Sequence, residues 1–129
     1  SVASRRLGSR RNSIWELVLH LAHGRYLLTE RIANRPAAPF PRAIREPWWP
    51  VAPSDSREQS WRDDLSLLEH CHITLIEAIE RATAEQLSRM PDGGEPIAHQ
   101  LFGLALHDAY HAGQIRLIAL GFSDRESSR

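Results

Sequence analysis

The chain has 129 residues, a length at which one domain can bury a core of its own. Its 16 basic and 16 acidic residues cancel, so no net charge attracts the chain to nucleic acid or to anionic lipid. The single cysteine, Cys71, excludes a disulfide within the chain and fits a reducing compartment, and no apolar run reaches the roughly 20 residues of a membrane span. We therefore expect one cytoplasmic domain over residues 1–129, without nucleic-acid or membrane partners.

The first 12 residues, SVASRRLGSRRN, are basic and lack a helical apolar stripe. They also begin without a methionine, and we expect that a segment upstream has been removed. The first predicted helix follows at Ser13, because Ser13 and Glu16 form a capping box in which each side chain binds the other residue's backbone amide. Its apolar face comprises Ile14, Leu17, Val18, Leu21, Leu28 and Ile32. Pro36 is expected to end it.

Residues 34–60 form a long loop that contains six of the eight prolines. A loop of this length without structure of its own is uncommon in a compact domain and is often functional. It carries Trp48 and Trp49, whose large apolar surfaces are unfavourable in water. We expect the loop to pack back on the helices, with these two residues as candidates for a pocket wall.

Three further helical segments are predicted after the loop. The second helix begins after Ser60 and runs to about Arg81, and its apolar stripe comprises Trp61, Leu65, Leu68, His72, Leu75 and Ile79. Thr83 and Gln86 form a second capping box that opens a short turn. A long helix then runs from Pro96 to Leu120, with Gly121 as its C-terminal cap and residues 122–129 as a polar tail. No strand pattern is visible, so the predicted class is all-α.

The last helix is apolar on two sides. One stripe comprises Ile97, Leu101, Leu104, Ile115 and Ile118, and the opposite side carries Phe102, Leu106, Tyr110, Leu117 and Leu120. A helix that is apolar nearly all round needs several neighbours. Two other long helices supply too little cover, so we expect a further helix before Ser1 or a second subunit.

Two histidines, His107 and His111, lie one turn apart on this helix. Imidazoles at positions i and i+4 can bind one metal ion together. The glutamate of a zinc-protease helix is absent, so that chemistry is not implied. The alternative is a pair of hydrogen-bonded histidines at a helix interface, and the spacing by itself leaves both interpretations open.

A third histidine, His20, is expected near this pair. The loop at 34–60 is long enough to return along a helix of about 30 Å, which would make the first two long helices parallel and the first and last antiparallel. His20 lies seven residues after Ser13 and His111 nine before Leu120, so the two would reach nearly the same level. Three neutral imidazoles would then converge and leave coordination positions open.

The segments SIWELVLHLA, WWPV and GLALHDAYHAGQIRLI resemble the DinB-like (DinB/YfiT) family of metal-binding four-helix bundles, over roughly residues 13–120. The resemblance implies an up-down-down-up bundle with a long crossover, and His20, His107 and His111 as the metal ligands. The family's first helix has no counterpart in this chain. A long apolar groove would then lie along the Phe102, Leu106 and Tyr110 side of the last helix, and we expect a homodimer through that surface.

The family includes thiol-dependent S-transferases. The resemblance thus implies a metal-dependent thiol transferase or hydrolase that acts on a small molecule, with a low-molecular-weight thiol as a candidate substrate. The ion is divalent, with zinc or nickel as the first candidates and iron as another, since imidazoles suit all of these. No general base is evident, and no catalytic residue is assigned. The alternative is a non-catalytic metal-binding or stress-response bundle.

Several other residues are candidates for the pocket. Asp108 needs a partner in an apolar stripe, and it would either orient a ligand imidazole or make a contact between helices. Gln114 lies on the histidine edge of its helix. His72 is expected to be buried, in the core or in the pocket. The remaining expectations are a solvated surface for His23, His70 and His99 and an inert buried thiol for Cys71.

Overall fold

The computed structural model describes residues 2–6, 12–35, 38–45, 48–55 and 57–127 of the chain. This part is mostly helical, which confirms the all-α class. The helices are α1 (Ile14–Ala33), α2 (Glu58–Arg81), α3 (Ala84–Ser88) and α4 (Ile97–Ser127), with 3-10 turns at Val2–Ser4 and Pro91–Gly93.

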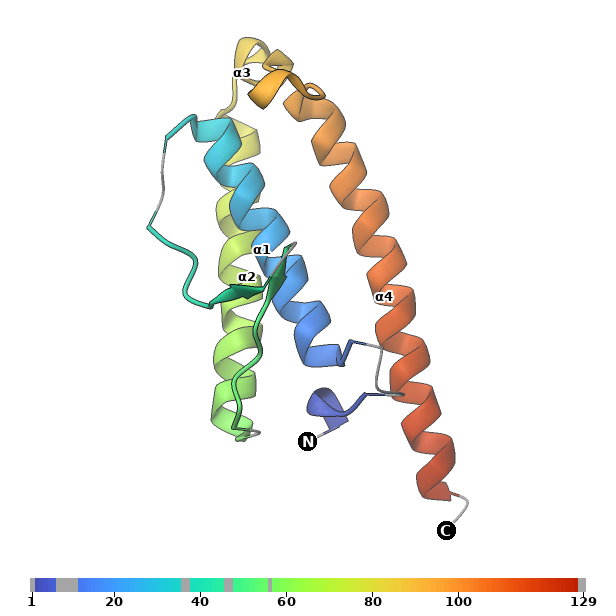
Figure 1. Cartoon of the computed structure of the whole chain (residues 1–129). Coiled ribbons are helices and arrows are strands. Elements are labelled where there is room, and N and C mark those ends of the chain that lie inside the picture. Colours follow the sequence, from blue (N-terminus) through green and yellow to red (C-terminus); the bar gives the residue numbers. More distant parts are fainter. Residues whose placement is uncertain (1, 7–11, 36–37, 46–47, 56, 128–129) are drawn as a thin grey trace.

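The long helices α2 and α4 both pack against α1. Helices α1 and α2 run side by side in the same direction, because the crossover between them returns along their length (Figure 1). Helix α4 runs in the opposite direction, and α1 contacts both α2 and α4. The predicted directions of the helices are therefore confirmed, and α1 is the element through which the other two are joined.

Both predicted capping boxes are present. The Ser13 hydroxyl accepts a hydrogen bond of 3.2 Å from the backbone amide of Glu16. The Glu16 carboxylate accepts one of 2.8 Å from the backbone amide of Ser13. Thr83 and Gln86 make the same reciprocal pair at the start of α3. Helix α1 ends at Asn34, which adopts a left-handed conformation with φ of 52°. Pro36, which was expected to end this helix, lies outside the described residues.

The crossover packs back on the bundle, as predicted. It contains a small antiparallel ribbon of β1 (Ile44–Arg45) and β2 (Trp49–Pro50), and β2 lies against α1. The expectation of no strand was wrong, because two-residue strands are too short to produce an alternating pattern. Pro50 is fully buried, and Trp49 packs beside Leu17 of α1.

Helix α2 begins at Glu58, earlier than predicted, and is rotated from the predicted face. Its buried residues are Asp64, Cys71 and Leu75, whereas His72 is exposed, so the expectation of a buried His72 was wrong. The cause is a polar contact: Asp64 is fully buried, accepts from the Trp15 indole at 2.6 Å and pairs with Arg42 of the crossover. A buried carboxylate needs such partners, and they fix which side of α2 faces α1.

Helix α4 continues past Gly121 to Ser127, so the predicted cap and tail were wrong. A glycine inside a helix costs about 1 kcal/mol relative to alanine. Continuing the helix keeps Phe122 buried beside Leu17 and Ile118, which offsets that cost. The opposite side of α4 is exposed: Phe102, Leu106, Tyr110 and Leu117 keep between 64% and 75% of their surface in solvent.

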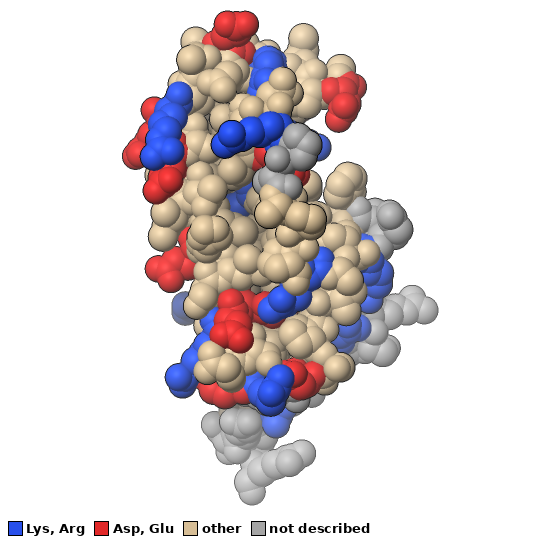
Figure 2. Space-filling view, turned by 90° about the vertical axis from the view of Figure 1, so that its left-hand side faces the viewer, with Lys and Arg blue, Asp and Glu red and all other residues tan. Residues whose placement is uncertain are grey.

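Basic and acidic side chains are interspersed on the face of the molecule shown in Figure 2. Among the described residues, no helix is both long enough and apolar enough to cross a membrane.

Candidate metal centre

The structure brings His20 of α1 together with His107 and His111 of α4. The Nε2 atom of His107 lies 3.0 Å from Nε2 of His20 and 2.8 Å from Nε2 of His111. One nitrogen from each ring lies within 4.8 Å of the other two. We refer to these three residues as the histidine cluster. The antiparallel pairing of α1 and α4 produces it by placing the middle of one helix beside the middle of the other (Figure 1).

Hydrogen bonds at the outer nitrogens define the tautomers. Nδ1 of His111 donates to Oε1 of Gln114 at 2.5 Å, and the Gln114 amide nitrogen donates to the Tyr110 hydroxyl at 3.2 Å, which orients the amide. Nδ1 of His20 donates to the backbone carbonyl of Trp48 at 3.3 Å. With their protons on Nδ1, both rings present bare Nε2 lone pairs inward. A neutral His107 has one hydrogen at most on Nε2, so it can donate to only one of these two nitrogens. At least one of the two close Nε2–Nε2 contacts therefore has no hydrogen bond, and a cation between the rings would relieve it.

Burial favours the neutral form of His20 and His107. It lowers the pKa of His20 from 6.5 to about 4, and the nearby His107 and His111 lower it further in spite of the bond to Trp48. Burial likewise lowers the pKa of His107 below its ordinary value. A metal ion binds neutral imidazole, so His20 and His107 need release no proton to bind one at neutral pH.

The donor set and its spacing fit a divalent ion. Nitrogens placed about 2.0–2.1 Å from a tetrahedral zinc ion are roughly 3.3 Å apart. The two separations at His107, 3.0 and 2.8 Å, therefore need only a small adjustment. Structural zinc sites are closed by four protein ligands, whereas catalytic sites keep a position open. Among the described residues, the group that could hold an ion consists of three histidines, which is the arrangement of an open site.

The two tryptophans of the crossover take different places. The Trp49 ring stacks on His20 with centroids 4.0 Å apart and an angle of 13° between the planes. It therefore forms a wall of the histidine cluster. The Trp48 side chain is 57% exposed, and this residue contributes its backbone carbonyl instead.

Asp108 makes a contact between helices, which was one of its two predicted roles. Its carboxylate binds the Arg25 guanidinium through two bonds of 3.2 and 2.5 Å. Arg25 also donates to the Leu21 carbonyl at 2.9 Å and to Nδ1 of His72 at 3.4 Å. The sequence analysis did not single out Arg25, although a basic residue five positions after His20 on the same helix could have indicated a partner for Asp108.

His23 is buried, so the expectation of a solvated side chain was wrong. The aromatic rings of Tyr26 and Phe40 lie against it, with centroids 6.1 and 4.9 Å from its own. Phe40 belongs to the crossover, whose path the helical periodicity does not encode. Burial lowers the pKa of His23. His70 and His99 are exposed, as predicted.

Cys71 is buried, as predicted. Burial raises the pKa of its thiol, which keeps the sulfur protonated and unreactive at neutral pH.

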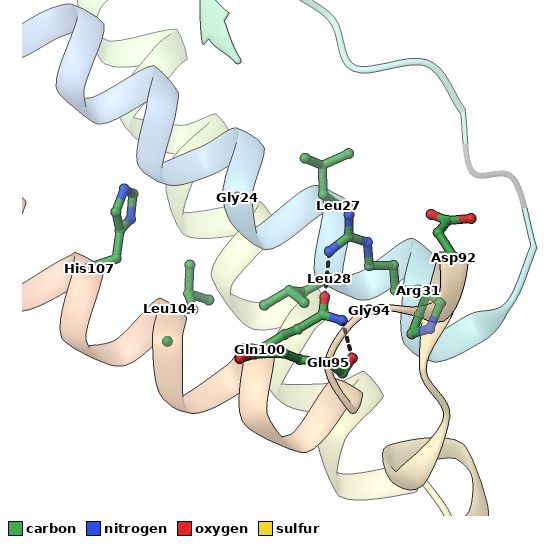
Figure 3. Close-up of a pocket in the computed structure, with 12 residues that line it drawn as sticks. Gly24, Leu27, Leu28, Arg31, Asp92, Gly94, Glu95, Gln100, Leu104 and His107 are labelled. Carbon is green, nitrogen blue, oxygen red and sulfur yellow. Dashed lines mark hydrogen bonds between the residues drawn. The ribbon is translucent and has the colours of Figure 1, made fainter. Parts of the chain in front are cut away.

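A groove of about 570 Å³ continues from His107 along the contact between α1 and α4 (Figure 3). We refer to it as the α1–α4 groove. Its lining residues are Gly24, Leu27, Leu28 and Arg31 of α1, Gln100, Gly103, Leu104 and His107 of α4, and Pro91, Asp92, Gly94 and Glu95 of the preceding turn. The groove was not predicted from the sequence, because it forms between α1, α4 and a turn that lie far apart in the chain.

The chain is a helical protein with a candidate metal centre: it has three long helices, a crossover that packs on α1 and a cluster of three histidines. The model of the DinB superfamily matches residues 3–115, which contain all three histidines, and the chain belongs to that superfamily. No curated protein and no solved structure matched the chain.

Proposed function

We propose that this protein is a metal-dependent enzyme, a thiol S-transferase or a hydrolase, that acts on a small molecule at the histidine cluster. The observation that carries the proposal is the inward convergence of three Nε2 atoms. Gln114 and the Trp48 carbonyl fix the tautomers of two of these rings, His111 and His20. An open groove beside the cluster supports a substrate-binding role, because a closed structural site would not need one.

A divalent ion in this cluster would supply a Lewis acid that lowers the pKa of a thiol or water and polarises an electrophile. The chain's own residues would prepare the site. Gln114 holds the His111 ring, the Trp48 carbonyl holds the His20 ring, and Trp49 covers one side of His20 against water. Asp108 is engaged by Arg25, so it does not serve as the general base in this arrangement.

The ligand assignment can be tested by elemental analysis of protein purified without added metal or a histidine tag. We expect one equivalent of a divalent metal, with zinc or nickel ahead of iron. His111→Ala should abolish stoichiometric binding, because it removes one of three ligands. His99→Ala is the matched control on the same helix, and its exposed ring should be dispensable. Equal metal content in both variants would refute the assignment.

An assay of turnover distinguishes a metal-dependent enzyme from a protein that only binds a metal. Metal-loaded protein should turn over a thiol with a generic electrophile, and chelation should remove that turnover. The second candidate function is a non-catalytic metal-binding or stress-response module. It would show full metal content with no turnover of thiols or esters.

We also propose a cytoplasmic homodimer. A single buried thiol fits a reducing compartment. The exposed side of α4 supports association, since contiguous apolar surface of this kind is typical of interfaces. Leu106, at 75% exposed, is the residue to change. Leu106→Glu should convert a sedimenting dimer to a monomer near micromolar concentration without loss of metal, and a stable wild-type monomer would contradict the proposal.

A further inference from the structure

The α1–α4 groove carries an inference about the substrate. We propose that the substrate is an elongated small molecule with an amino-acid group at one end, and that the end of the groove far from the histidine cluster binds this group. This inference rests on the proposed function for the reaction at the cluster, but the recognition of the amino-acid group can be tested separately.

The groove is aligned with the histidine cluster. On α1, His20, Gly24, Leu27 and Arg31 follow one another at helical spacing on a single face. The groove opens at His107 and ends at Gln100, seven residues earlier on α4. At 1.5 Å of rise per residue, its two ends lie about 10 Å apart. A molecule that extends from one end to the other would span this distance.

The middle of the groove is apolar, and Gly103 leaves space on its α4 side. Leu27, Leu28 and Leu104 line it, and Figure 3 shows Leu104 and Leu28 between His107 and Gln100. A Cβ atom added at Gly103 would meet nothing within 4 Å. This stretch therefore suits methylene or peptide-like groups that need no charged partner.

The far end holds charged groups of both signs that are not paired with one another. The Arg31 guanidinium donates to the Gln100 side-chain oxygen, and within the described residues it forms no ion pair. Gln100 is held in turn by the Glu95 backbone carbonyl at 2.7 Å. Asp92 and Glu95 line the same end, and among the described residues their carboxylates likewise make no ion pair.

This set of charges fits a zwitterion better than an ion of one sign. A guanidinium binds a carboxylate through two parallel hydrogen bonds, and carboxylates bind an ammonium group. A second arginine adds positive charge near Arg31: Arg89 donates to the backbone carbonyls of Arg31 and Ile32. An amino-acid group would satisfy Arg31 with its carboxylate and Asp92 or Glu95 with its ammonium.

The test uses the full chain loaded with cobalt(II). Glutathione serves as a thiol with a free amino-acid group, and 2-mercaptoethanol as a thiol without one. Calorimetry measures affinity, and the visible spectrum of cobalt reports whether the thiol reaches the metal. We expect glutathione to bind at least tenfold more tightly than 2-mercaptoethanol. Arg31→Gln should remove that preference while leaving the affinity for 2-mercaptoethanol unchanged.

A matched pair of variants tests the path of the groove. Gly103→Leu should fill the groove and weaken the binding of glutathione at least tenfold. Ala105→Leu places the same side chain at a residue that does not line the groove, so it should leave this affinity unchanged. Equal affinities for both thiols in the wild type, or a preference that survives Arg31→Gln, would overturn the proposal.

S-methylglutathione and metal-free protein separate this inference from the proposed function. This probe has no free thiol but keeps the amino-acid group. If it binds the wild type and binds Arg31→Gln at least tenfold more weakly, the recognition of the amino-acid group stands even if no metal binds. If it binds both proteins equally, the inference fails even if the histidine cluster holds a metal.

Discussion

Helix α1 has two contacts of different character. Toward α2 and the crossover it presents a mainly apolar surface, in which Trp15 and Leu19 are almost fully buried against Trp61 and Leu67. Toward α4 it packs apolar side chains as well, such as Leu17 beside Ile118 and Phe122. This second contact also contains a polar part, in which His20, Arg25 and Arg31 each bind a polar residue of α4. A 3.6-residue period thus lets one helix stabilise the fold on one side and position chemical groups on the other.

The polar contact is the weaker source of stability. Ion pairs such as Arg25–Asp108 contribute about 1 kcal/mol or less when they are partly exposed, and each buried polar group must be satisfied before it contributes anything. Burial of an apolar side chain contributes about 1.5–3 kcal/mol. The α1–α2 contact can therefore support the fold while the α1–α4 contact keeps an open groove.

The largest expected effect comes from breaking the apolar contact. Leu19→Ala leaves a cavity beside Trp15 and should lower the free energy of unfolding by about 2–5 kcal/mol, as measured by denaturant titration. Leu65→Ala is the control, because Leu65 is 40% exposed and its truncation should cost less than about 1.5 kcal/mol. The folded fraction of both variants should keep its metal. Loss of metal from folded Leu19→Ala would show that the two contacts are not independent.

The sequence is enough to predict the helices and the three histidines that meet between α1 and α4. The capping box at Ser13 and the i, i+4 pair of His107 and His111 are local patterns, so they could be recognised directly. The place of His20 followed from the length of the crossover and the directions that it imposes. These features account for the helices and for the convergence of the three rings.

The rest depends on contacts between distant residues. The rotation of α2 is set by Asp64, whose partners Trp15 and Arg42 lie 49 and 22 residues away, and a shift of one position along α2 gives an equally periodic stripe that includes His72. The burial of His23 depends on Phe40 of the crossover. Neither contact has a local pattern in the sequence.

A smaller effect, on metal affinity, is expected from changing Gln114, which supports His111 of the histidine cluster. Gln114→Ala removes the acceptor that fixes the His111 tautomer, and loss of such a partner typically weakens metal affinity 10–100-fold. The affinity can be measured by competition with a chromophoric chelator. Gln59→Ala is the control, because Gln59 is exposed on α2 and bonds Asp63 of the same helix. Affinities within twofold of the wild type would show that Gln114 does not orient the ring.

The smallest expected effect is on the pH dependence of stability, and it comes from His23. This titratable residue lies on the side of α1 that the crossover covers. Burial lowers its pKa in the folded state, so below the ordinary pKa of about 6.5 the unfolded chain binds more protons than the folded chain. Its contribution to stability is therefore complete above pH 6.5 and is lost as the pH falls toward the lowered value. His23→Gln should unfold with a weaker dependence on pH than the wild type between pH 7 and 5.

This last variant also separates the histidines by role. His23 lies three residues from His20, but Tyr26 and Phe40 enclose it, and it is not part of the histidine cluster. His23→Gln should thus keep full metal content, whereas His20→Gln should lose it. Chemical denaturation of both variants at pH 7 and 5, with metal analysis of the folded protein, measures the two properties together. A His23→Gln protein with wild-type pH dependence and no metal would reverse the assignment of these two neighbouring residues.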